Sequence, residues 1–182
     1  MPISSLDSIF SPTKQLTYWL AASRDRRVSI WSSKLNDNLF QIIDWLTFET
    51  ELTPKELPSR DKSAKKSFWD KNPNVLAFFA PQAENENGTK NPDTIVYVGN
   101  DPKKQILFYN FSKKQIMRTM DLTEFPECIS LSPRSNLIAF GTKSRLLQVK
   151  DYNRSTFQDY AQHSDSVSSV CFSNDGKYLF ST

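Results

Sequence analysis

A short apolar strand that ends in a turn recurs four times along the chain, and this repeat restricts the fold more than any other feature. The four strand ends are Phe10-Ser11-Pro12, Phe79-Ala80-Pro81, Leu131-Ser132-Pro133 and Phe172-Ser173-Asn174. The last two copies are 41 residues apart, which sets the period. Longer spacings earlier in the chain indicate two insertions, one on each side of Phe79. A fixed period of this length predicts stacked units that share one continuous core.

Each of the first three copies also holds a second aliphatic strand, which ends at Trp31, Tyr109 and Lys150 respectively. Polar turns separate the strands, so a complete unit reads as four short strands. A period of about 40 to 45 residues with four strands per unit is typical of WD-repeat propeller blades. The pattern therefore predicts an all-β fold: a WD-repeat β-propeller fragment of about three and a half four-stranded blades, with two long loop insertions.

The predicted blades divide the chain at its turns and insertions. Their bounds are 1–48 for blade one, 49–74 for the first insertion, 75–120 for blade two with a loop at 82–93, 121–161 for blade three and 162–182 for a partial blade four. The expected strands are 4–10, 18–23, 28–32 and 41–48; 75–80, 94–98, 105–110 and 115–120; 127–131, 137–141, 146–150 and 156–160; and 166–172 and 178–181. Because a blade buries its faces only between two neighbours, we expect this fragment to expose a blade face and strand edges.

Composition argues against several classes of function. The single histidine, His163, cannot form a two-His metal site, and four glycines are too few for dinucleotide- or phosphate-binding loops. Cys128 and Cys171 lie in separate apolar stretches and are expected to be buried, reduced thiols. The net charge of +3 is small for a nucleic-acid-binding protein, and no apolar run approaches the roughly 18 residues of a membrane-spanning helix. We expect an intracellular protein without a visible secretory leader, with no enzyme activity, no cofactor, no nucleic-acid partner and no membrane partner.

WD-repeat blades are commonly held together by linked His, Ser or Thr, Asp and Trp side chains, and two blades of this sequence resemble that pattern. The matching residues are Ser23, Asp25 and Trp31 in blade one, and His163 and Ser181 in blade four. The resemblance implies structural roles for these five residues. No blade carries all four members, so apolar packing is expected to contribute more than usual. No nucleophile is placed beside His163, so a catalytic role is not expected.

The first insertion contains a cluster of basic and aromatic residues. Its members are Arg60, Lys62, Lys65, Lys66, Phe68, Trp69 and Lys71. In one interpretation the charges are simply solvated and the two aromatic residues fold back against the blade edge. In the other, the cluster is a partner-binding loop in which Phe68 and Trp69 add apolar contact to the electrostatic attraction.

Six segments narrow the resemblance further. They are WLAASRDRRVSIWSS, IIDWLTF, TIVYVGND, ILFYNFSKKQI, SLSPRSNLIAFGT and FQDYAQHSDSV, in this order and with this spacing. Over most of residues 10–182 the chain resembles the propeller region of the WD repeat-containing protein 90 family, also called the proteome of centriole protein 16 family. That resemblance implies a large protein with several propellers, located in the cytoplasm and cytoskeleton at the centriole, basal body or cilium.

Two functions follow from these observations, and the fold alone does not choose between them. In the first, the propeller is a structural scaffold that binds other proteins, with tubulin or microtubules and centriolar or axonemal scaffold proteins as the partners implied by the resemblance. In the second, it is an adaptor that presents clients to a ubiquitin ligase or another regulatory complex. The proteins captured by a pull-down would distinguish the two.

Overall fold

The structure is a computed structural model of the 182-residue chain. It describes residues 3–12, 14–23, 27–33, 39–44, 75–84, 88, 90, 92–98, 104–154 and 156–182. The predicted insertion at 49–74, and with it the basic and aromatic cluster, lies outside the described residues, as does Asp25.

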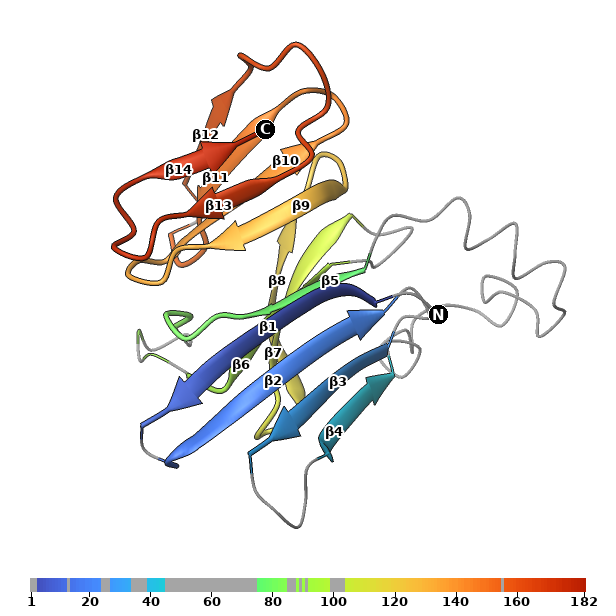
Figure 1. Ribbon diagram of the computed structural model, residues 1–182, viewed down its shortest axis with the longest axis vertical. Helices are drawn as coiled ribbons and strands as arrows, with labels where there is room; N and C mark the ends of the chain where they lie inside the picture. The colour runs from blue at the N-terminus through green and yellow to red at the C-terminus, as the bar shows by residue number, and fades with distance from the viewer. Residues whose placement is uncertain are drawn as a thin grey trace, which may run out of the picture.

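The described residues form fourteen strands in four antiparallel sheets, three with four strands and one with two (Figure 1). Blade one holds β1 (Ile3–Ser11), β2 (Leu16–Ser23), β3 (Arg27–Ser32) and β4 (Leu39–Asp44). Blade two holds β5 (Leu76–Phe79), β6 (Thr94–Val98), β7 (Gln105–Asn110) and β8 (Gln115–Asp121). Blade three holds β9 (Pro126–Leu131), β10 (Leu137–Thr142), β11 (Leu147–Asp151) and β12 (Phe157–Tyr160), and blade four holds β13 (Val170–Phe172) and β14 (Leu179–Ser181). Each sheet is a simple meander, which confirms the predicted all-β propeller fragment.

The first three strands of blade two are buried on both faces because they are mostly apolar at successive positions. All five residues of β6 are buried, and alternate side chains point to opposite sides. Ile95 and Tyr97 pack with Leu20 and Ile30 of blade one. Val96 and Val98 join the cluster that includes residues of blade three. The apolar residues at successive positions of β6 are therefore explained by the place of blade two between blades one and three.

The outward face of blade one has no neighbour among the described residues. Leu6, Trp19 and Trp31 lie on this face and are 68%, 46% and 41% exposed. The register places Trp19 opposite Trp31, so the two indoles extend one apolar surface. Blade four likewise exposes Phe180, opposite Cys171. These surfaces agree with the expected uncovered blade faces.

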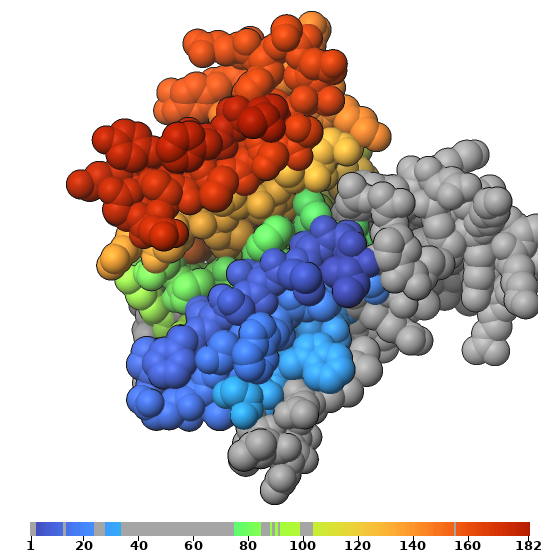
Figure 2. Space-filling view, viewed as in Figure 1, coloured from blue at the N-terminus to red at the C-terminus, as the bar shows by residue number. Residues whose placement is uncertain are grey.

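The first strands of the four blades lie next to one another. β1 lies beside β5, β5 beside β9, and β9 beside β13, so these inner strands run through the middle of the assembly (Figure 1). In the space-filling view, the blue, green, gold and red parts of the chain follow one another in that order (Figure 2).

Several expectations differ from the structure in detail. β2 begins at 16 instead of 18, β4 begins at 39 instead of 41, and β13 covers 170–172 instead of 166–172. The shorter β13 results from Val167, which leaves the strand line to donate its backbone N–H to the Thr142 carbonyl at 3.1 Å. The prediction of two buried thiols is wrong for Cys171, which is exposed, and holds only in part for Cys128, which is half-buried. Strand alternation turns its neighbours Val170 and Phe172 toward blade three and Cys171 toward the uncovered face.

Blade three approaches blade four closely at Gly141. A Cβ at this position would clash with Val167 Cγ1 and lie 2.9 Å from the Sγ of Cys128. Val167 is fully buried, so it has little room to move. Glycine is therefore required here by the close approach of two chain segments.

We expect Gly141→Ala to lower the free energy of unfolding of the intact propeller by about 1–3 kcal/mol, because the added methyl group overpacks this contact. Urea denaturation measures the change. Adding Val167→Ala removes much of the clash, so the double variant should lose less than the sum of the two single changes. An unchanged urea midpoint for Gly141→Ala would contradict the assigned packing.

Candidate protein-interaction site

Blade one is joined to blade two by side chains of β1 that bind the free backbone edge of β5. Ser5 Oγ accepts a hydrogen bond from the Ala77 N–H at 2.9 Å and donates to the Ala77 carbonyl at 3.2 Å. Asp7 Oδ2 accepts from the Phe79 N–H at 2.8 Å. The β5 edge needs these partners because its other neighbour in the sheet, β6, bonds only alternate residues.

Blade three is joined to blade four in a similar way. The Phe172 N–H of β13 donates to Ser130 Oγ of β9 at 3.1 Å. Alignment of the strand-ending turns places Phe78 of β5 at the position that Ser130 has in β9. Phenylalanine offers no acceptor, so no matching bond joins the described parts of β5 and β9. The Ser132 N–H donates to the Leu137 carbonyl, next to β10, at 2.9 Å. Successive N–H groups of a strand point to opposite sides, so the N–H of the preceding residue, Leu131, points away from β10.

Blades two and three are instead fastened away from the inner strands. Arg118 stacks its guanidinium carbon 4.2 Å from the centre of the Phe108 ring and donates to Asn153 Oδ1 at 3.2 Å. Asn153 also accepts from the Glu84 N–H at 3.2 Å and donates to the Gln82 carbonyl at 3.1 Å. This polar cluster holds the two blades at their outer parts and leaves their inner strands unbonded to each other.

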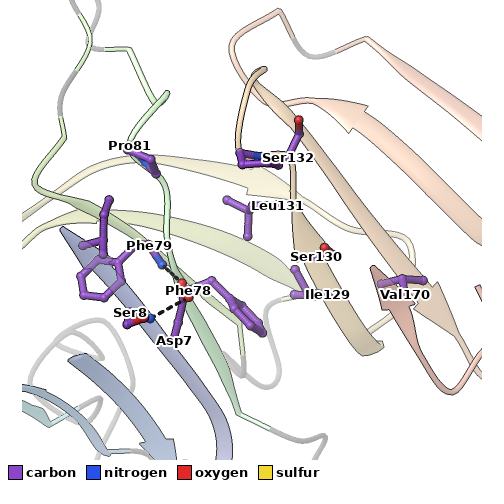
Figure 3. Close-up of a pocket in the computed structure, with 12 residues that line it drawn as sticks. Asp7, Ser8, Phe78, Phe79, Pro81, Ile129, Ser130, Leu131, Ser132 and Val170 are labelled. Atoms are coloured by element: carbon purple, nitrogen blue, oxygen red, sulfur yellow. Dashed lines mark hydrogen bonds between the residues drawn. The ribbon is translucent and has the colours of Figure 1, made fainter. Parts of the chain in front are cut away.

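A cleft of about 540 Å³ opens among the inner strands (Figure 3). We call it the inner-strand cleft. Its lining residues are Asp7, Ser8, Ile9, Phe78, Phe79, Pro81, Ile129, Ser130, Leu131, Ser132, Pro133 and Val170. All four described blades contribute, so the cleft depends on how the blades assemble. A cleft of this size lies in the range of small-ligand and side-chain binding sites.

Asp7 is the one charged side chain among the described residues that line the cleft. Burial raises the pKa of its carboxyl group, and the hydrogen bonds from the Phe79 and Ser8 N–H groups oppose this rise. The Ser8 N–H bonds Oδ1 at 2.8 Å. No described Lys, Arg or His forms an ion pair with this carboxylate. The cleft therefore combines apolar walls with one uncompensated negative charge.

The structure brings together two of the five residues predicted to hold the blades. His163 Nε2 and Ser181 Oγ are 2.8 Å apart and share a hydrogen bond, which connects the segment before β13 to β14. Ser23 is the last residue of β2. Trp31 lies on the uncovered face of blade one, opposite Trp19. Asp25 lies outside the described residues, so the network of blade one stays a prediction.

Blade three contains a polar connection that the sequence reasoning missed. Glu124, in the segment before β9, accepts a hydrogen bond from Ser144 Oγ. Ser144 Oγ is 3.0 Å from Thr142 Oγ1, which also bonds the Leu146 carbonyl at 3.2 Å. Thr142 ends the second strand of blade three, as Ser181 ends β14 in blade four. In the pattern of WD repeats, the histidine of blade three would stand at Leu122. The carboxylate of Glu124, two residues later, was the sequence signal for this connection.

The described residues contain no cluster of three or more His, Cys, Asp or Glu side chains suited to a metal ion. Among the residues that the structure describes, no helix is long and apolar enough to cross a membrane.

We expect the stability of the intact propeller relative to Asp7→Asn to depend on pH. A raised pKa in the folded state means that folding favours the protonated form. The stabilising contribution is therefore complete below the ordinary aspartate pKa of 3.8 and is lost as pH rises through the raised value. Urea titrations of both proteins from pH 3 to pH 7 measure the difference between their free energies of unfolding. The contributions of the other titratable groups cancel in this difference. A difference that stays constant or rises with pH would contradict it.

We expect His163→Ala and Ser181→Ala each to lower the free energy of unfolding by about 0.5–1.5 kcal/mol, because each removes one hydrogen bond. In a double-mutant cycle the two losses should not add, since both remove the same bond. Ser164→Ala, an exposed neighbour of His163, serves as the control and should have no effect. Additive losses would show that the two side chains act separately.

Comparison with known proteins agrees with this architecture. The family model described as "WDR90, 4th beta-propeller" matches residues 12–182. WD repeat-containing protein 90 of Xenopus tropicalis is 36% identical over 161 residues, which cover 88% of this chain and 8% of that protein. The Homo sapiens and Mus musculus proteins of the same name are 31% and 30% identical, and each alignment covers 89% of this chain and 8% of the relative.

This chain therefore spans about 8% of the length of the relatives it matches. None of these descriptions names a catalytic activity. The resemblance inferred from the six sequence segments is confirmed over most of the chain. The order of the strands, the shared inner edge and the match over residues 12–182 lead to one assignment: the chain belongs to the WDR90 β-propeller family.

Proposed function

We propose that this chain is part of a protein-interaction scaffold of centrioles or cilia that contacts microtubules. Membership of the WDR90 propeller family carries the proposal, because propellers as a fold serve many functions. The general role, a propeller that binds other proteins, is supported by that family and by the surfaces that several blades form together. Microtubule co-sedimentation tests the more specific part of the proposal.

The basic cluster of the first insertion provides the means for such a contact. Arg60, Lys62, Lys65, Lys66 and Lys71 place five positive charges within twelve residues of sequence. The outer surface of tubulin is acidic, so electrostatic attraction would favour the encounter. Attraction between exposed charges weakens when salt shortens the screening length to about 8 Å at physiological ionic strength and less above it. Salt dependence is therefore a property by which the proposal can be judged.

We expect the intact propeller to co-sediment with microtubules and to lose at least about tenfold in affinity when Lys62, Lys65 and Lys66 are changed to Glu. The physical reason is that three attractive charges become repulsive. The measurement is a co-sedimentation titration at two salt concentrations, with the wild-type protein binding less tightly at the higher one.

A matched control makes the same change in charge elsewhere. Lys113, Lys114 and Lys177 are exposed in turns of blades two and four, so changing them to Glu alters net charge equally. This control should bind nearly as well as the wild type. Equal binding of wild type and the insertion variant would overturn the role of the insertion. Absence of any tubulin binding, together with capture of ubiquitin-ligase subunits by the intact propeller, would replace the scaffold proposal with the adaptor function.

A further inference from the structure

We propose that the inner-strand cleft binds an arginine side chain from an extended segment of a partner protein. In this assignment Asp7 is the counter-ion and Phe78 is the surface on which the guanidinium group stacks. The inference does not rest on microtubule binding: it concerns a cleft with a negative charge, whereas the microtubule proposal concerns a basic insertion.

The carboxylate of Asp7 is held in place but still has capacity to accept hydrogen bonds. Oδ1 accepts from the Ser8 N–H and Oδ2 from the Phe79 N–H, each at 2.8 Å. A carboxylate oxygen accepts two hydrogen bonds, so each oxygen keeps one free position. Two free positions on one carboxylate match the two parallel N–H groups of a guanidinium fork. Because Asp7 is ordered by the backbone before a ligand arrives, little further ordering is required on binding.

The charge of Asp7 is not compensated within the described part of the cleft. Its other lining residues are apolar or neutral, and partial burial of the carboxylate costs free energy in the empty state. A cation that enters restores the balance. The same reasoning excludes an anionic ligand, which the carboxylate would repel.

Phe78 makes arginine a better occupant than lysine. Its side chain is only partly buried, and its ring lies beside Asp7 at the cleft (Figure 3). A planar guanidinium group can stack on an aromatic ring while its edge pairs with a carboxylate. A lysine ammonium group is compact and more strongly hydrated, so it would lose more on entering apolar surroundings. Within blade two, Arg118 already stacks on Phe108 at 4.2 Å while it donates to the Asn153 side-chain oxygen, which shows that this protein combines guanidinium stacking with a hydrogen bond.

The backbone of the partner also finds a hydrogen-bond donor. The N–H of Leu131 points away from β10, on the cleft side of β9, and no described residue accepts a hydrogen bond from it. A carbonyl group in the partner segment can accept from it, as Ser130 accepts from Phe172 at the next blade junction. The cleft volume of about 540 Å³ leaves room for residues on both sides of the arginine.

Closure of a propeller would leave this cleft open. In a closed ring, adjacent blades pack face to face, so they would cover the outward faces of blades one and four, where Trp19 and Phe180 are exposed. The cleft is lined by inner strands and the turns that follow them, which in a propeller face the central axis. A partner segment therefore reaches it along the axis and does not have to displace a blade.

The test uses the intact propeller and acetylated pentapeptides in which arginine, lysine, citrulline or glutamate is flanked by alanines. Binding is followed by NMR chemical shifts. We expect saturable binding of the arginine peptide, with weaker binding of the lysine peptide and no measurable binding of the glutamate peptide. Citrulline has nearly the shape of arginine without its charge, so its peptide should bind about tenfold to a hundredfold more weakly.

Two variants connect the binding to the proposed residues. Asp7→Asn should weaken the arginine peptide about tenfold to a hundredfold and remove its advantage over citrulline. Phe78→Leu leaves the Asp7 hydrogen bonds in place and should reduce the preference for arginine over lysine. The matched control is Asp165→Asn, because Asp165 is exposed, lies outside the cleft and also accepts a hydrogen bond from the next residue, at 2.6 Å. It should bind like the wild type.

The proposal is overturned if the arginine peptide shows no saturable binding, if citrulline binds equally well, or if a folded Asp7→Asn variant binds arginine as tightly as the wild type. Equal affinity for lysine and arginine would overturn the guanidinium assignment. The microtubule titration can fail while these results hold, and the reverse is equally possible, so the two proposals are tested independently.

Discussion

Each inner strand of a blade has a backbone edge that its own sheet cannot satisfy, and the assembly of this protein depends on how the neighbouring blade satisfies it. In β5 the Ala77 and Phe79 N–H groups point out of the sheet and are bonded by Ser5 and Asp7 of β1. In β13 the Phe172 N–H is bonded by Ser130. Short polar side chains on one inner strand thus complete the edge of the next, while apolar packing between the sheets supplies most of the driving force.

One register position distinguishes the junction of blades two and three from that of blades three and four, whereas blades one and two are joined through Ser5 and Asp7 at other positions. Ser130 and Phe78 occupy the same place relative to their turns, yet only the serine can accept a hydrogen bond. Where phenylalanine stands, the inner strands of blades two and three remain unbonded, the fastening moves outward to Arg118 and Asn153, and the inner-strand cleft lies at the junction. A departure from the repeat therefore coincides with the site that has the chemistry to recognise another protein. Such local breaks in an otherwise consistent pattern are expected at functional sites.

The sequence predicted the strands well because their signals are local. Apolar runs and turn residues located every strand of the described part to within a few residues, and the period grouped them into blades. Contacts between blades were harder, since Ser5 and Asp7 look like ordinary polar positions until the register of β1 against β5 is known. Glu124 was missed because histidine was sought in its segment. The burial of Cys171 was misjudged because an apolar neighbourhood in sequence does not show which face of a strand a residue occupies.

The two uncovered blade faces have a consequence for how such a ring is made in the cell. Trp19 and Trp31 lie on one face and Phe180 on the other, and no described residue covers either face. In a closed propeller an adjacent blade covers such a face, so a face whose adjacent blade is translated later stays open until that blade has left the ribosome. At about 5–20 residues per second, each further blade of about 40 residues adds seconds to that interval. The nascent chain therefore presents an indole- or phenyl-rich surface that chaperones must shield, for a time set by the rest of the ring.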